Sequence, residues 1–376
     1  MRSSRFSKFF NIDWILIGAT LPLLFFGLST MSSFTGDNLL ADKQMIWILI
    51  SFTVFFVFSF IDWRFLKRSD ILFVLFLISS ATLSLLFIMR SIKGARSWFD
   101  LGSISLQPAD FVKLILILIL AKYFSRRHIE IAHAKHIFIS GIYALVPFIL
   151  VLLQPALGGA IIIFLIWLGM VSVSGVSNKH LAAVFLAGIL VFAMLWGSVF
   201  KPYQKQRIMT FINPEADIRG SGYNALQAEI AVGSGQIFGK GIGYGTQSHL
   251  KFLPEYQTDF IFAAFAEEWG LIGVLILLLC FAVIFWRIIY NSFKSGSNFE
   301  ALFGLGLAIF FMSHFTVNVG MNLGLLPVTG ITLPFVSYGG SHLLAEFAGL
   351  GILMSMRRYS RVTHRDNMKN EFLGPV

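Results

Sequence analysis

The sequence predicts an all-α polytopic membrane protein with about ten transmembrane helices. Its 376 residues have a mean hydropathy of +0.78, with 56% hydrophobic and only 13% charged residues, which is unlike the composition of soluble globular domains. Apolar runs of about 20 residues, the length that an α-helix needs to cross a bilayer, recur along the whole chain. We therefore expect one integral membrane domain over residues 1–376.

The apolar runs divide the chain into ten predicted spans. The first follows three basic residues, as in a signal peptide, but no small-residue cleavage site is visible, so we predict a retained helix. Only residues 154–159 separate the fifth and sixth runs, and one kinked double-length helix is the alternative to two spans. The predicted spans are residues 13–33, 44–62, 69–90, 107–124, 137–153, 157–175, 181–200, 259–288, 300–323 and 340–356.

The charged residues lie mainly in the short segments between the apolar runs. With ten crossings, most of the 29 Lys and Arg residues fall on the side that also holds both termini. This positive-inside pattern predicts cytoplasmic termini and a basic cytoplasmic tail at 357–376. Orientation and anionic lipid headgroups explain the net charge of +10 better than nucleic-acid binding does.

Residues 201–258 are too polar for a span. Because a structureless segment of this length is uncommon, we predict a large extracytoplasmic loop between helices 7 and 8 that contains short amphipathic or re-entrant helices. Its glycines invite a nucleotide-binding interpretation, but no strand precedes them and no βαβ unit surrounds them. The single cysteine, Cys280, excludes an internal disulfide, and no metal site is indicated by the spacing of His and Cys residues.

The strongest candidate site lies within residues 239–270. A glycine-rich polar loop leads into an apolar helix, for which Thr258 is the expected N-cap and Asp259 a first-turn residue. Glu267 and Glu268 follow about 12 Å further along the same helix. Carboxylates in membrane helices are costly and usually functional, although a capping role at the headgroup level would also account for Asp259.

Two further outward segments carry intramembrane charge or a broken helix. Asp110 and Lys113 lie three residues apart at the start of the fourth span, so they share a helix face and could pair; a snorkelling lysine is the alternative. Residues 326–340 are rich in Gly and Pro, which indicates either bent backbone that lines a cavity or an ordinary tight turn. All three segments lie at the same predicted end, so we expect one cavity that opens outward.

Short motifs follow one another in a fixed order along nearly the whole chain. They are Gln107-Pro108, Phe111-Val112-Lys113-Leu114, Lys205-Gln206-Arg207-Ile208, residues 220–227, Gly239-Lys240-Gly241, Gly245-Thr246-Gln247, Phe252-Leu253-Pro254-Glu255, residues 258–263, Glu267-Glu268, Pro327-Val328-Thr329-Gly330 and residues 333–340. In this order they resemble the SEDS family (shape, elongation, division and sporulation), whose members include RodA, FtsW and SpoVE. The short tails and residues 239–241 are more similar to RodA than to FtsW.

The resemblance implies a peptidoglycan glycosyltransferase of the bacterial cytoplasmic (inner) membrane, which polymerises lipid II into glycan strands on the outer face during cell elongation. It implies Asp259 as the catalytic residue, with Lys113 in the same cavity, and a class B penicillin-binding protein (transpeptidase) as partner. The chain departs from the family pattern at five positions: Ala109-Asp110 replace Ser-Glu, Gln257 replaces His, and Ala156 and Gly159 replace Asp and Thr.

The implied reaction is the inverting attack of an acceptor 4-hydroxyl on the anomeric carbon of the donor, which releases undecaprenyl pyrophosphate. A carboxylate base contributes on the order of 10²–10⁴ in rate, and the leaving pyrophosphate needs cations or a divalent ion such as Mg²⁺; no other cofactor is expected. Asp259 is the expected base. The expected substrate-binding residues are Lys113 with Asp110, then Arg207, Lys240 and Arg96, and also Gln206, Gln247 and Ser337. Glu255, Glu267 and Glu268 are structural or of unassigned role.

Two other functions fit the same features. A lipid II flippase would use the same cavity, but transporters place charged, broken helices near the midplane, often in inverted repeats. Here the polar features gather at the outer ends of spans 4, 8 and 10. A non-catalytic scaffold that activates the penicillin-binding partner is the third function, which the loss of the acid at Ala156 keeps open.

Overall fold

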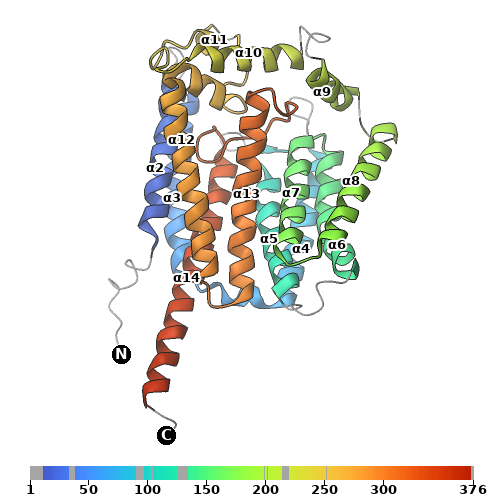
Figure 1. Cartoon of the computed structure of the whole chain (residues 1–376), viewed down its shortest axis with the longest axis vertical. Helices are drawn as coiled ribbons and strands as arrows, with labels where there is room; N and C mark the ends of the chain where they lie inside the picture. The colour runs from blue at the N-terminus through green and yellow to red at the C-terminus, as the bar shows by residue number, and fades with distance from the viewer. Residues whose placement is uncertain are drawn as a thin grey trace.

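The computed structural model describes residues 12–33, 39–89, 97–100, 102, 105–125, 134–198, 200, 202–213, 220–250 and 252–373. These residues are almost wholly helical, and the strands described among them are one antiparallel pair, β1 (Phe99–Asp100) and β2 (Ser105–Leu106). Figure 1 shows long helices bundled side by side, with short helices across one end. The predicted all-α polytopic membrane fold is confirmed.

Each of the ten predicted spans coincides with a helix. These helices are α2 (Trp14–Ser32), α3 (Leu39–Phe60), α4 (Ser69–Leu85), α5 (Pro108–Ser125), α6 (Ala134–Leu153), α7 (Leu157–Val173), α8 (Asn178–Ser198), α12 (Ile261–Phe293), α13 (Asn298–Asn322) and α14 (Gly340–Leu373), with short 3₁₀ turns η1 (Trp63–Lys67) and η2 (Leu86–Ile88) beside α4. Seven helices of the described chain are long and apolar enough to cross a membrane, and α7 is apolar but shorter. Ten crossings therefore remain a prediction.

The bundle has two different ends. Helices α9 (Pro202–Ile212), α10 (Ser221–Ser234) and α11 (Thr246–His249) lie across the upper end in Figure 1, whereas the C-terminal part of α14 extends from the lower end. Helix α2 also begins at the lower end, so the two ends of the described chain share one side of the bundle. That this side faces the cytoplasm remains a prediction from the charge pattern.

Helices α6 and α7 are separate, so the alternative of one kinked double-length helix is wrong. Helix α6 ends at Leu153, α7 begins at Leu157, and the two helices pack against each other. The buried Gln154 side chain lies in the turn between them, where its Nε2 atom donates to the Leu83 carbonyl of α4 at 2.7 Å. This contact ties the turn to a third helix.

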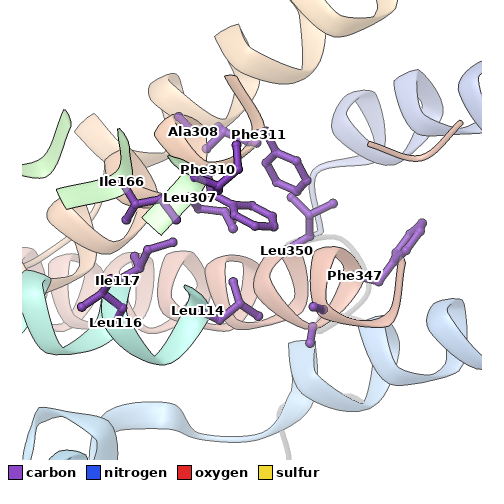
Figure 2. Packing of buried hydrophobic residues seen from close by; sticks show 14 of the residues in the cluster. Leu114, Leu116, Ile117, Ile166, Leu307, Ala308, Phe310, Phe311, Phe347 and Leu350 are labelled. Atoms are coloured by element: carbon purple, nitrogen blue, oxygen red, sulfur yellow. The ribbon is translucent and has the colours of Figure 1, made fainter. Parts of the chain in front are cut away.

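Buried apolar side chains from α5, α7, α13 and α14 form the centre of the bundle (Figure 2). Leu114 and Ile117 of α5, Phe310 and Phe311 of α13, and Phe347 of α14 are all buried. Lipid is as apolar as these side chains, so close van der Waals packing, rather than removal from water, stabilises contacts between membrane helices. This packing fixes the first turns of α5 and α14, which carry polar residues described below.

An ion cluster holds the lower end of α2 against α12 and α14. The Asp13 carboxylate caps α2 at the Leu16 N–H (3.2 Å) and accepts from Arg287 Nη2 (2.6 Å) and Asn291 Nδ2 (2.8 Å), and Arg357 Nη1 lies 3.1 Å away. Burial alone would raise the pKa of Asp13, but the hydrogen bonds from Arg287 and Asn291 and the charge of Arg357 outweigh it. The pKa of Asp13 therefore lies below its ordinary value.

Helix α12 differs from the prediction at its start and in its middle. It begins at Ile261, and the Thr258 hydroxyl donates to the Glu255 carbonyl (3.2 Å) instead of accepting from a helix N–H group. Asp259 therefore lies in the turn before the helix, not in its first turn. The helix is also interrupted at Gly270, which has φ 64° and ψ −167°, a conformation that glycine adopts without a Cβ clash.

Candidate functional site

Asp259 lies half-buried in the turn before α12, and its main chain is fixed on both sides. Its N–H donates to the Glu255 carbonyl (3.1 Å), and its carbonyl accepts from Nδ2 of Asn318 (2.9 Å) and Nδ2 of Asn322 (3.1 Å) on α13. Its carboxylate lies against Gly330, where an added Cβ would be 3.3 Å from Oδ2. The turn is therefore held in place, and the carboxylate faces a position that carries no side chain.

The same turn is bound to the segment 331–338, which lies between α13 and α14. Ser337 Oγ donates to the Thr258 carbonyl at 2.6 Å, and the Tyr338 N–H donates to the Gln257 carbonyl at 2.8 Å. Ser337, predicted as a substrate-binding residue, thus holds the main chain next to Asp259 in this structure.

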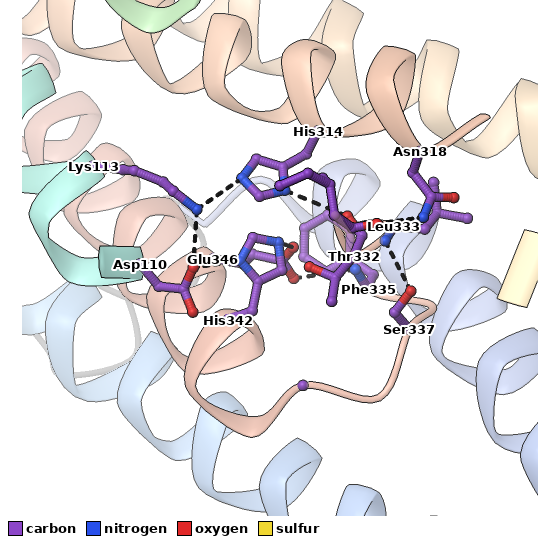
Figure 3. A network of polar contacts seen from close by, with 12 residues as sticks. Asp110, Lys113, His314, Asn318, Thr332, Leu333, Phe335, Ser337, His342 and Glu346 are labelled. Atoms are coloured by element: carbon purple, nitrogen blue, oxygen red, sulfur yellow. Dashed lines mark hydrogen bonds and ion pairs between the residues drawn. The ribbon is translucent and has the colours of Figure 1, made fainter. Parts of the chain in front are cut away.

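A buried network of charged and polar side chains lies beside the segment 331–338 (Figure 3). Lys113 Nζ lies 3.1 Å from Asp110 Oδ1 and 3.2 Å from His314 Nε2, and His314 Nδ1 lies 3.4 Å from the Thr332 carbonyl oxygen. The side chains of Asp110, Lys113 and His314 are all buried. The Asp110–Lys113 pair that the sequence allowed is present, so the alternative of a snorkelling lysine is wrong.

His342 and Glu346 of α14 extend this network. His342 Nδ1 lies 3.3 Å from Asp110 Oδ1, and its Nε2 lies 2.9 Å from Glu346 Oε1. The other Glu346 oxygen accepts from the Phe335 N–H at 3.1 Å. Ionisable groups buried inside a membrane protein are costly unless they pair with one another. The pairing found here joins α5, α13 and α14 to the segment that holds the Asp259 turn.

A second polar cluster lies where the glycine-rich loop meets α12. Glu267 is wholly buried and accepts from Lys240 Nζ (2.7 Å) and from the Gln247 N–H (3.1 Å), while Glu268 accepts from Ser33 Oγ of the α2 end at 2.6 Å. These contacts attach the loop to α12 and α2. The geometry thus gives Glu267 and Glu268 structural partners, and it engages Lys240 in an ion pair.

Arg207 of α9 lines a small cavity, open to solvent, between α9, α10 and the loop after α13. Glu229 of α10 also lines it, together with Pro327 and Val328. Val328 lies two residues before Gly330, which contacts the Asp259 carboxylate. The cavity therefore brings an arginine to the same loop that borders Asp259.

The comparisons with known proteins agree on the family of this chain. A family model for cell cycle proteins, FtsW/RodA/SpoVE, matches residues 9–362. The chain belongs to this family. Stage V sporulation protein E of Bacillus subtilis (strain 168) is 34% identical over 362 residues, which cover 93% of this chain and 98% of that protein. Peptidoglycan glycosyltransferase MrdB of Escherichia coli (strain K12) is 38% identical over 270 residues, 72% of this chain and 73% of that protein.

Solved structures of this family have the same fold. A chain of a peptidoglycan synthase complex, described for its structural coordination of polymerization and crosslinking, aligns with a TM-score of 0.79 and 31% identity over 93% of this chain and 98% of that chain. The rod shape determining protein RodA of Thermus thermophilus aligns with a TM-score of 0.69 and 29% identity over 93% of this chain and 97% of that chain. The predicted SEDS membership is confirmed.

Two further predicted site residues lie apart from the two clusters. Gln206 is exposed on α9, next to Arg207. Glu255 is exposed, and its carbonyl accepts the N–H groups of residues 258–260, so it shapes the turn that carries Asp259. Arg96 lies outside the described residues.

Five residues of the site were not predicted from the sequence, namely His314, Asn318, Asn322, His342 and Glu346. A signal was available, because His314, Asn318 and Asn322 recur every four residues on an otherwise apolar helix and so form a polar stripe on one face. His342 and Glu346 are likewise four residues apart, the spacing of an ion pair on a helix.

Proposed function

We propose that this chain polymerises lipid II into glycan strands on the outer face of a bacterial cytoplasmic membrane, with Asp259 as the general base. Its family and the peptidoglycan glycosyltransferases among its relatives support a glycosyltransferase of cell-wall synthesis. The observation that carries the assignment to Asp259 is a half-buried carboxylate on a turn held by α13 and the segment 331–338.

The proposed step transfers one proton and exchanges one C–O bond for another. The 4-hydroxyl oxygen of the acceptor N-acetylglucosamine attacks the anomeric carbon of the donor N-acetylmuramic acid, and Asp259 takes the hydroxyl proton. The bond between that carbon and the pyrophosphate oxygen breaks on the opposite face, so the electron pair leaves with undecaprenyl pyrophosphate and the configuration inverts. Firm placement of the turn matters, since a misplacement of about 1 Å can cost on the order of 100-fold in rate.

The leaving pyrophosphate needs positive charge nearby. Among the predicted cations, Lys113 is paired with Asp110 and Lys240 with Glu267, whereas Arg207 lines the small cavity next to the loop that borders Asp259. We therefore assign Arg207 to the pyrophosphate and give Lys113 a positioning role within the buried network. Among the described residues, no three or more His, Cys, Asp or Glu side chains are arranged so that they could hold a metal ion. Mg²⁺ often binds through one or two carboxylates and substrate phosphates, so we expect any Mg²⁺ to arrive with the pyrophosphate.

The charge pattern and the relatives support the proposed membrane orientation and the proposed partner. The charge pattern supports cytoplasmic termini, which puts α9, α10 and α11 on the outer side. The likeness to a chain of a peptidoglycan synthase complex supports a class B penicillin-binding protein as the partner that crosslinks the new strands.

An assay of what happens to lipid II distinguishes a polymerase from the lipid II flippase and from the scaffold. Purified protein in detergent, where no two sides of a bilayer exist, is supplied with lipid II in the presence of the cognate partner. A polymerase makes glycan strands under these conditions. No polymer, together with lipid II translocation in vesicles, would favour the flippase, and neither activity would favour the scaffold.

A further inference from the structure

The glycine-rich loop closes the break in α12 through its backbone. The carbonyls of Gln236 and Ile237 accept the N–H groups of Leu271 (2.9 Å) and Ile272 (3.2 Å), which the break at Gly270 leaves without partners in their own helix. The loop thereby supplies the hydrogen bonds that a continuous helix would have made.

The backbone carbonyls of α12 on the N-terminal side of the break also bond to the loop. The N–H groups of Lys240 and Gly241 donate to the carbonyls of Glu267 and Glu268, both at 3.0 Å. The approach is so close that a Cβ on Gly239 would lie 2.1 Å from the Glu268 carbonyl oxygen. Chain that enters the hydrocarbon region of a bilayer must satisfy its backbone polar groups internally, and these bonds meet that requirement for the turn.

Three of the exposed side chains in the same turn are apolar or aromatic, while Gln236 at its start is exposed and polar. Ile237 is 56% exposed, Phe238 81% and Tyr244 75%. The turn is bonded to Leu271 and Ile272, whose side chains are also exposed and begin the apolar outer face of α12. The exposed residues of the turn therefore continue the surface that α12 presents to lipid.

The depth of this surface follows from the length of α12. Arg287, which binds Asp13 at the lower end, lies 16 residues beyond Leu271, about 24 Å along a helix that rises 1.5 Å per residue. The hydrocarbon core of a bilayer is about 30 Å thick. If Arg287 marks the inner boundary, Leu271 and the turn bonded to it lie at or just inside the outer boundary.

We propose that residues 236–244 form a re-entrant turn in the outer leaflet, with Ile237 and Phe238 in contact with acyl chains and Tyr244 at the headgroup level. Aromatic side chains favour this interface, and the ion pair with Glu267 neutralises the charge of Lys240 at that depth. The turn thus attaches the outer segment between α10 and α12 to the membrane. The occupant of this apolar surface is lipid, and not a second protein chain.

Site-directed spin labelling of the full chain in lipid nanodiscs tests this placement. In a Cys280→Ser background, Phe238→Cys carries a nitroxide, and its collisions with O₂ and with the water-soluble relaxation agent NiEDDA are measured. Leu275→Cys, on the exposed face of α12, is the lipid control. Asp42→Cys, an exposed acidic position in the first turn of α3, is the water control.

We expect the label at position 238 to match the one at 275, with O₂ collisions exceeding NiEDDA collisions. If Phe238→Cys does not give folded protein, Tyr244→Cys allows the same measurement with a shallower result expected. NiEDDA collisions as frequent as at position 42 would show that the turn lies in water and would overturn the proposal. Low collision rates with both reagents would show that protein covers the turn, which would overturn it as well.

Discussion

Replacing Lys113 with Met tests whether the buried network holds α5, α13 and α14 together. Met keeps the apolar stem but removes the ammonium group, which leaves the Asp110 carboxylate with Ser341 (3.1 Å) and His342 (3.3 Å). Removing one partner of a buried ion pair costs about 3–5 kcal/mol. With an unfolding entropy of about 2.1 cal/mol/K per residue over 376 residues, this loss lowers Tm by roughly 4–6 °C.

Two measurements on the same preparation read out this change. Thermal unfolding in detergent, followed by tryptophan fluorescence, gives the shift in Tm, and equilibrium binding of lipid II gives Kd. We expect Tm to fall while Kd stays unchanged, because Lys113 Nζ is buried against Asp110 and His314. The double variant Lys113→Met/Asp110→Asn removes both charges and is expected to recover part of the lost Tm.

The opposite pattern would refute this reasoning. An unchanged Tm together with weakened lipid II binding would show that Lys113 contacts the pyrophosphate directly. Lys113, and not Arg207, would then be the cation that binds the pyrophosphate, and the network would not be needed for stability.

Four other substitutions, one of them a matched control, test separate parts of the structure. Asp13→Asn should lower Tm at pH 7. Because the pKa of Asp13 is depressed in the folded state, the stability that its carboxylate contributes is complete above the ordinary pKa of 3.8 and is lost as the pH falls through the folded pKa. The Tm values of the variant and the wild type should therefore converge in a series of measurements at acid pH. Gly235→Ala puts a Cβ 2.0 Å from a carbonyl oxygen of α12 and should abolish folded yield, whereas Gly233→Ala, with open space around it, should be neutral or stabilise by about 0.5–1 kcal/mol in the same expression and melting assays. Asn318→Ala leaves the Asp259 carbonyl with only one of its two side-chain donors, Asn322, and should lower kcat on the order of 10–100-fold at unchanged KM in steady-state polymerisation.

Local sequence features predicted the helices and one ion pair. Each apolar run gave a helix because the length and composition of a run are properties of that segment alone, as for α13, predicted at 300–323 and found at Asn298–Asn322. The Asp110–Lys113 pair was also predictable, since a separation of three residues on one helix already places two side chains together.

Features that depend on contacts between distant segments were not predictable. The hydrogen bonds at the Gly270 break come from residues 27 to 35 positions earlier in the chain. Within residues 261–293 only a glycine marks the break, and Gly273 lies in the same helix without one. The bond from Ser337 to the Thr258 carbonyl joins segments 79 residues apart, so the turn before α12 formed where a capped helix was expected. His342 meets Asp110 across 232 residues, and only packing reveals that pair.

The most direct test of the proposed function is lipid II polymerisation by Asp259→Asn, purified with the cognate partner. Asn preserves the size of the side chain and the main-chain bonds from Asn318 and Asn322, but it removes the basic oxygen. We predict that polymerisation falls at least about 100-fold, the lower end for loss of a general base, while lipid II binding and Tm stay at wild-type values. Near wild-type polymerisation by Asp259→Asn would contradict the assignment of Asp259 as the base.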